Sequence, residues 1–148
     1  MVLMSMIYAE LAEKLDSGHD AVLLAMDDAG VSEVLAAVTR AAQQGSARLD
    51  HGAVTFLFRI DAGAKDIEFH NDAVEWRLDA AKAAELIELL SSMVDSGIPE
   101  GHHYLEGMST PTETVVLSRN EYPLSSLPPE AVFPLTDPAV VQTAFRTK

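Results

Sequence analysis

An internal repeat constrains the fold of this chain more than any other feature of its sequence. Shifting the chain by 52 residues places residues 19–45 on residues 71–97 without a gap. The identities between the two copies are Asp20/Asp72, Ala21/Ala73, Val22/Val74, Asp27/Asp79, Ala29/Ala81, Glu33/Glu85 and Gly45/Gly97. A repeat of this kind in a chain of 148 residues indicates a single duplicated domain that is long enough to bury a core.

Each copy is expected to contain a strand followed by a long amphipathic helix. The first helix should begin near Asp27 or Asp28 and end at Gly45, and Asp79 and Gly97 occupy the same positions in the second copy. Aspartate is a favoured N-cap residue, and glycine readily takes the left-handed conformation that ends a helix. One apolar stripe runs along each helix: Val31, Val34, Leu35, Val38 and Ala42 in the first, and Ala83, Leu86, Ile87, Leu90 and Val94 in the second.

The strand before the second helix alternates between apolar and charged residues. Val74, Trp76 and Leu78 should face the core, and Glu75 and Arg77 should face water. Residues 22–26 form the equivalent strand, with Val22, Leu24 and Met26 on one face. Residues 7–15 fit either a strand or a helix; the alternation of residues 66–69 favours a strand, with a turn at residues 17–20.

Two further strands are expected after each helix, and here the two copies diverge. Residues 46–50 match 102–106 at an offset of 56, and the strand expected at residues 54–60 corresponds to the one at 113–118, which begins at an offset of 59. The second copy therefore carries insertions around residues 98–101 and 108–112. Insertions fall on surface loops, where partners and ligands are commonly bound, although neutral drift in loop length accounts for them equally well.

These patterns predict an α+β fold made of two ββαββ-like units, about residues 7–61 and 66–122, in one domain. Both helices should cover one face of an antiparallel sheet. The opposite face would carry Leu23, Leu57, Val116, Glu75 and Arg77. Residues 123–148 should form a Pro-rich arm, since five of the seven prolines lie between positions 123 and 138, with a short last helix beginning at Asp137-Pro138.

The charge of the chain narrows the classes of partner. Its 23 acidic residues against 10 lysines and arginines give a formal net charge of −13. This charge disfavours nucleic acids and anionic membranes and favours a basic protein partner. The chain has no cysteine, and no apolar run approaches the roughly 18–20 residues that cross a bilayer. Together with the absence of a basic leader, this predicts a cytoplasmic protein.

No arrangement of residues in the sequence predicts catalysis. His19 and His70 are expected in turns and His51 in a hairpin loop, all solvated. His102, His103 and Glu106 form the one cluster that could be considered as a metal site. Adjacent residues of a strand point to opposite faces, so the two histidines are not expected to bind one ion. The aspartates at the helix starts are better explained as caps than as a catalytic pair. We therefore predict a protein that is not an enzyme and has no metal or cofactor.

Residues 101–106 and 114–122, read as GHHYLE and TVVLSRNEY, resemble a segment of the small bacterial immunity proteins of polymorphic-toxin systems. The resemblance covers about Leu86–Tyr122. The first copy departs from it, with Ser46-Ala47-Arg48-Leu49-Asp50 and no Asn-Glu-Tyr. The resemblance implies a cytosolic antidote that binds and occludes a cognate toxin domain. A purely structural interpretation is also open: Tyr104 and Tyr122 would pack at sheet ends, and Asn120 and Glu121 would bond the backbone in a turn.

The predicted partner-binding residues lie mainly in the second copy. They are Glu75, Glu100, His102, Tyr104, Glu106, Met108, Thr110, Glu113, Asn120, Glu121 and Tyr122. Two other functions remain open from the sequence. One is a small-molecule or enzyme site between the two units, which would be lined by Tyr104, His103 and Arg77. The other is a structural homodimer joined through residues 123–148.

Overall fold

The structure, a computed structural model, describes residues 4–16, 19–52, 54–95, 101–120 and 132–134. Within these ranges the fold is α+β with two ββαββ-like units, as the sequence predicted. The first unit consists of β1 (Met4–Asp16), β2 (His19–Met26), α1 (Asp28–Gln44), β3 (Ser46–His51) and β4 (Val54–Ile60). The second consists of β5 (Lys65–Phe69), β6 (Ala73–Leu78), α2 (Ala80–Asp95), β7 (Gly101–Leu105) and β8 (Val115–Arg119), and β9 (Val132–Pro134) follows.

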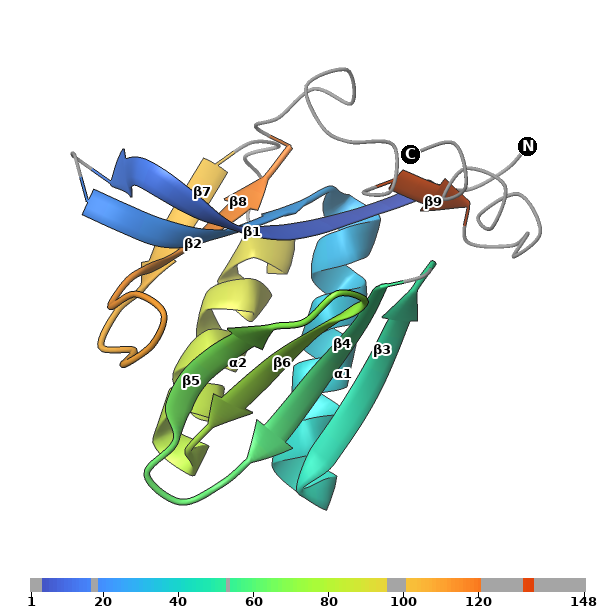
Figure 1. The fold of residues 1–148 in the computed structure, drawn as a ribbon. Helices are drawn as coiled ribbons and strands as arrows, with labels where there is room; N and C mark the ends of the chain where they lie inside the picture. Colours follow the sequence, from blue (N-terminus) through green and yellow to red (C-terminus); the bar gives the residue numbers. More distant parts are fainter. Residues whose placement is uncertain (1–3, 17–18, 53, 96–100, 121–131, 135–148) are drawn as a thin grey trace.

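The predicted single antiparallel sheet is wrong, because the strands form two mixed sheets (Figure 1). The five-stranded sheet has the order β7-β8-β2-β1-β9, and the four-stranded sheet has the order β3-β4-β6-β5. Each unit places its first hairpin in one sheet and its second hairpin in the other, since its helix carries the chain across. Parallel pairing of β2 with β8 and of β4 with β6 then joins the two units.

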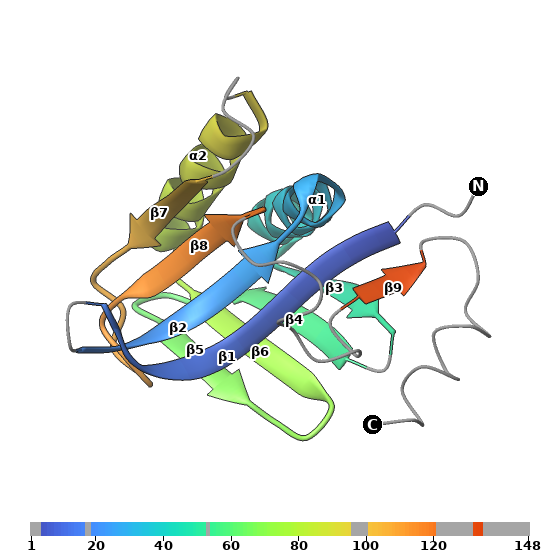
Figure 2. The same ribbon diagram turned by 90° about the horizontal axis from the view of Figure 1, so that it is seen from above.

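Both helices pack against the side of the four-stranded sheet that faces away from the viewer in Figure 1, and beneath the five-stranded sheet. The view from above in Figure 2 shows α1 and α2 side by side. One core cluster includes residues from both helices and both sheets. Trp76 and Phe58 meet in it with ring centroids 5.8 Å apart. Full burial of a large apolar side chain contributes roughly 1.5–3 kcal/mol, so this shared core stabilises both units together.

The helix ends are those expected from the sequence. The Asp27 carboxylate accepts a hydrogen bond from the Gly30 N–H at 2.7 Å, and Asp79 accepts one from the Lys82 N–H at 2.7 Å. Gly45 adopts φ 93° and its N–H donates to the Ala41 carbonyl oxygen at 2.7 Å. These bonds confirm the N-cap role predicted for Asp27 and Asp79. Gly97 lies outside the described residues.

The strand predictions hold for β1 and β6. β1 is a strand, and in β6 the core-facing Val74, Trp76 and Leu78 are buried while Glu75 and Arg77 are partly exposed. The turn predicted at residues 17–20 is wrong for His19 and Asp20, which belong to β2, with His19 paired to Asp16.

The predicted face opposite the helices is divided between the two sheets. Leu23 and Val116 lie in the five-stranded sheet and are buried, whereas Leu57, Glu75 and Arg77 lie in the four-stranded sheet.

Little of the predicted C-terminal arm falls within the described residues. β9 pairs antiparallel with β1, with Ser5 opposite Phe133, at the edge of the five-stranded sheet. The rest of residues 123–148, including the predicted last helix, lies outside them.

Neither α1 nor α2 is long and apolar enough to cross a membrane.

Candidate functional site

The predicted partner-binding residues fall in three separate places. The largest group lies on β7 and on the loop that follows it: His102, Tyr104, Glu106, Met108, Thr110 and Glu113. Asn120 follows β8, and Glu75 lies on β6 in the other sheet. Glu100, Glu121 and Tyr122 lie outside the described residues. The set is therefore not one surface, and β7 with its loop is the part that forms a contiguous region.

β7 presents two aromatic side chains at an edge of the five-stranded sheet. Tyr104 is 44% exposed, and His102 is exposed on the same face. Their ring centroids are 5.4 Å apart with an interplanar angle of 83°, an edge-to-face arrangement. His103 and Leu105 point to the other side, where Leu105 is fully buried. The alternation inferred from the sequence is confirmed, and it leaves the pair accessible.

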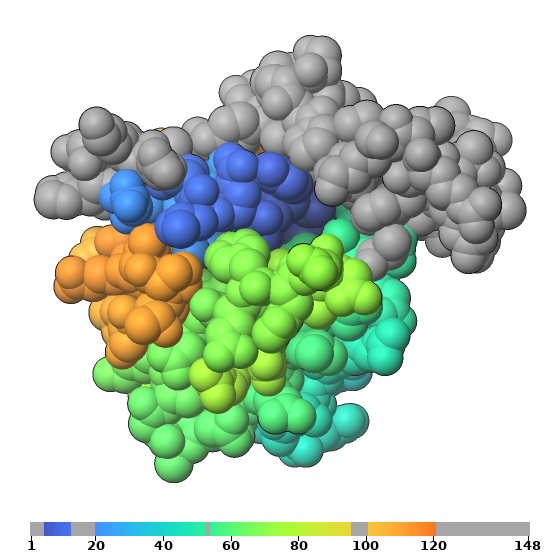
Figure 3. Space-filling model, viewed as in Figure 1, coloured from blue at the N-terminus to red at the C-terminus, as the bar shows by residue number. Residues whose placement is uncertain are grey.

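The loop at residues 106–114 binds the edge of the four-stranded sheet. The Ser109 N–H donates to the Lys65 carbonyl oxygen at 2.8 Å, and the Ile67 N–H donates to the Thr110 carbonyl oxygen at 2.9 Å. The Thr110 hydroxyl donates to Asp66 Oδ1 at 2.9 Å. Met108, a predicted contact residue, is buried in the core. The loop thus covers part of the β5 edge (Figure 3), and its exposed carboxylates are Glu106 and Glu113.

The end of the resembling motif connects the two helices. The Arg119 guanidinium donates to the Met93 carbonyl oxygen near the end of α2, and its Nε lies 3.7 Å from Asp28 Oδ1 at the start of α1. Asn120 has a φ of 57°. Its side-chain carboxamide donates to Asp28 Oδ1 at 3.0 Å, and its backbone N–H donates to the Met26 carbonyl oxygen at 2.9 Å. These contacts support the structural interpretation of Asn120.

Glu75 belongs to a network of charges on the open face of the four-stranded sheet. Arg59 Nε lies 3.4 Å from Glu75 Oε2, and Arg77 Nη2 lies 3.3 Å from Glu68 Oε1. His70 Nε2 is 3.5 Å from Glu68 Oε2 and 3.9 Å from Glu75 Oε1. Ligand atoms of Glu68, His70 and Glu75 all lie within 4.8 Å of one another. Sequence reasoning missed this cluster, which depends on Glu68 being opposite Glu75 in the β5–β6 pair. Two arginines already pair with its carboxylates, so we assign it no metal.

His51 is buried, and the prediction that it is solvated is wrong. Its ring lies between the two sheets, with Nε2 3.1 Å from the Ser5 carbonyl oxygen of β1. Burial lowers the pKa of His51 to about 4, and the bond to Ser5 opposes this shift. Burial also raises the pKa of the Glu33 carboxyl in α1. Ser5 and His51 are both inaccessible, which favours a structural role over nucleophilic catalysis.

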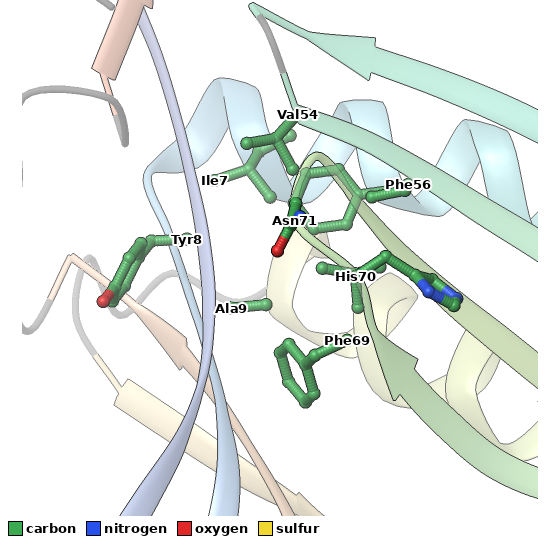
Figure 4. Close-up of a pocket in the computed structure, with 10 residues that line it drawn as sticks. Ile7, Tyr8, Ala9, Val54, Phe56, Phe69, His70 and Asn71 are labelled. Atoms are coloured by element: carbon green, nitrogen blue, oxygen red, sulfur yellow. The ribbon is translucent and has the colours of Figure 1, made fainter.

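A cavity of about 240 Å³ opens between the two sheets (Figure 4). It lies where β1 passes the start of β4 and the β5–β6 turn, so both units contribute to it. Its lining residues are Ile7, Tyr8, Ala9, Val54, Phe56, Phe69, His70, Asn71, Ala73 and Val74. The sequence predicted that a site between the units would be lined by Tyr104, His103 and Arg77. The cavity has a different lining, which is mostly apolar in its side chains.

Comparison with known proteins gives one distant structural likeness. No family model matches the chain, and no curated protein matches it. The crystal structure of Drosophila Suppressor of Fused is similar over 80% of this chain and 28% of that chain, with 9% sequence identity and a TM-score of 0.47.

Proposed function

We propose that this protein is a cytoplasmic antidote that binds a bacterial toxin domain and occludes its active site. The observation that carries the proposal is the exposed His102–Tyr104 pair on the edge strand β7, followed by the exposed carboxylates of Glu106 and Glu113. The likeness of this segment to immunity proteins supports the proposal, because the residues that carry the likeness include this pair.

The chemistry of this region suits a protein partner better than a substrate. Tyrosine supplies a large contact area with few rotatable bonds and is enriched among the residues that dominate binding energy. Carboxylates beside it speed association with a basic protein. An antidote needs no catalytic group, only a surface that covers the toxin's active site. The net charge of −13 favours a basic toxin, such as a nuclease.

The first test measures binding of the purified protein to the toxin domain encoded by the neighbouring gene. Tyr104→Ala should weaken binding by about 30-fold, equivalent to roughly 2 kcal/mol. Arg48 occupies the matching position in the first unit at the offset of 56 and is also exposed. Arg48→Ala is therefore the matched control and should leave the affinity unchanged. Equal affinities for wild type and Tyr104→Ala would contradict the assignment of this surface.

The second test reverses charges on the loop. The double variant Glu106→Lys/Glu113→Lys should slow association by about tenfold at low salt, and the difference should shrink at high salt. Glu88→Lys, on the exposed side of α2, controls for the change in net charge alone. In a bacterial host that produces the toxin, the wild-type protein should restore growth. Absence of any binding to the neighbouring toxin, or no rescue of growth, would refute the proposed function.

A further inference from the structure

The cavity between the sheets has a size and a mixed lining that suit a small aromatic molecule. Its volume is about 240 Å³. An apolar protein cavity of about 150 Å³ is large enough to bind benzene. This cavity therefore has room for one aromatic ring together with a short substituent.

Apolar side chains from both sheets face each other across the cavity (Figure 4). Ile7 and Ala9 point from β1 into the cavity, Ile7 near Val54 and Ala9 on the side of Phe69 of β5, and Phe56 of β4 lies deeper in the core. Ile7 and Phe56 are buried, whereas Phe69 is 39% exposed at the opening. Leu11 shares the face of β1 that carries Ile7 and Ala9, and it is 46% exposed. An apolar ring would cover such surface and gain contacts with these side chains.

Polar atoms also line the cavity. Tyr8 contributes to the lining, yet its ring lies on the far side of β1 in Figure 4, so its backbone faces the cavity. The carboxamide of Asn71, in the β5–β6 turn, projects toward β1. It offers both a donor and an acceptor.

We propose that this cavity binds a single-ring aromatic compound with a hydrogen-bonding substituent, whose ring packs against the apolar lining at Ile7, Ala9 and Phe69 and whose substituent bonds Asn71. This ligand function is independent of toxin binding, because the cavity and the β7 surface share no residues. The ring accounts for the apolar walls, and the polar substituent accounts for the mixed lining. His70 is a less suitable partner, because its ring points away from β1 toward Glu68 and Glu75.

The test titrates the full chain with p-cresol and with toluene and follows amide chemical shifts by NMR. Wild type should show saturable shifts for residues 7–9 and 69–74, with p-cresol binding more tightly than toluene. Asn71→Ala should weaken p-cresol binding by about three- to tenfold, the range expected for one hydrogen bond, and leave toluene binding unchanged. Absence of saturable binding in wild type, or saturable shifts that map elsewhere, would overturn the proposal.

A second set of variants fills the cavity. Ala9→Leu and Ala73→Leu both place a larger side chain in the lining, and each should reduce p-cresol affinity by at least about tenfold because the ring and the new side chain compete for the same space. Ala36→Leu makes the same chemical change on the exposed side of α1 and should leave affinity unchanged. Two folded filling variants that bind p-cresol as tightly as wild type would also overturn the proposal.

Discussion

The strands β2 and β6 occupy the same position in the two units, yet they lie in different environments. They share Ala21/Ala73 and Val22/Val74 at the offset of 52. Every residue of β2 from Ala21 to Met26 is buried, whereas β6 alternates between buried and partly exposed residues. The duplicated backbone thus supports one sheet buried on both faces at this strand and one sheet with an open face. The side chains on the second face of the strand determine whether that face is buried or open. On this face the two strands differ most at Leu23/Glu75 and Ala25/Arg77.

Exchanging the residues at the first of these positions should produce the largest effect. Leu23 is 3% exposed, so Leu23→Glu buries a carboxylate without a partner and should lower the free energy of unfolding by roughly 3–5 kcal/mol. Glu75→Leu places an apolar side chain on the open face of the other sheet and should change it by less than about 1 kcal/mol. Urea denaturation of the two variants measures both values. Similar losses in the two would show that the open face of β6 is not an open face in solution.

The two helices differ at their first turns. Gly30 and Lys82 are equivalent at the offset of 52. A Cβ atom at Gly30 would lie 2.2 Å from the Met6 carbonyl oxygen, so the start of α1 must approach β1 more closely than an alanine allows. Gly30→Ala should therefore destabilise the protein by about 2 kcal/mol or more, although alanine favours a helix by about 1 kcal/mol over glycine.

The matched variant in α2 is Lys82→Ala, which removes the hydrogen bonds from Nζ to Glu85 and to the Glu106 carbonyl oxygen. We expect a loss of about 1 kcal/mol. Thermal unfolding of the two variants gives the comparison. A stabilised Gly30→Ala protein would show that helix propensity outweighs the close approach of α1 to β1.

His51 makes the contact between the sheets sensitive to acid. Its pKa is about 4 in the folded protein and about 6.5 in the unfolded chain, so the unfolded chain binds more protons between these values. Stability is therefore fully present above about pH 6.5 and falls as the pH drops toward 4. The full shift amounts to on the order of 3 kcal/mol. Glu33, whose pKa is raised by burial, gains a proton more readily in the folded state and opposes this trend.

The variant His51→Gln tests this assignment, since its side chain does not titrate. Urea denaturation of wild type and variant at a series of pH values between 4 and 7 gives the two slopes. The wild-type free energy of unfolding should decrease toward acid more steeply than that of His51→Gln. Parallel pH profiles would show that another group controls the loss of stability.

Local features of the fold could be predicted because each depends on residues close together in the sequence. Asp27 and Asp79 as N-caps, Gly45 as the end of α1, and the facing of Val74, Trp76 and Leu78 all follow from short-range patterns. The unbroken apolar run of residues 21–26 also carried a signal of burial on both faces that the prediction did not use. Analogy with β6, which alternates, conceals this signal.

The pairing of strands could not be predicted, because side-chain periodicity gives the face of a strand and not its neighbour. Nothing in β2 specifies that β8 of the other unit lies parallel to it. The burial of His51 against Ser5 and the cavity beside Phe69 both depend on how the two sheets meet, so they were missed for the same reason. The burial of Met108, a predicted contact residue, could not be predicted either, because it depends on the loop pairing with Lys65 and Ile67.

The smallest effect is expected for the charges on the open face of the four-stranded sheet. Arg59 is equivalent to the buried Ser118 at the offset of 59, but its own side chain is 58% exposed and pairs with Glu75 at 3.4 Å. A double-mutant cycle of Arg59→Ala and Glu75→Ala should give a coupling of less than about 1 kcal/mol at low salt. Near 1 M salt the screening length is about 3 Å, and the coupling should disappear. A coupling above about 2 kcal/mol that persists in salt would mean that this face is shielded from water, as the five-stranded sheet is at β2, and the contrast between the two sheets would then fail.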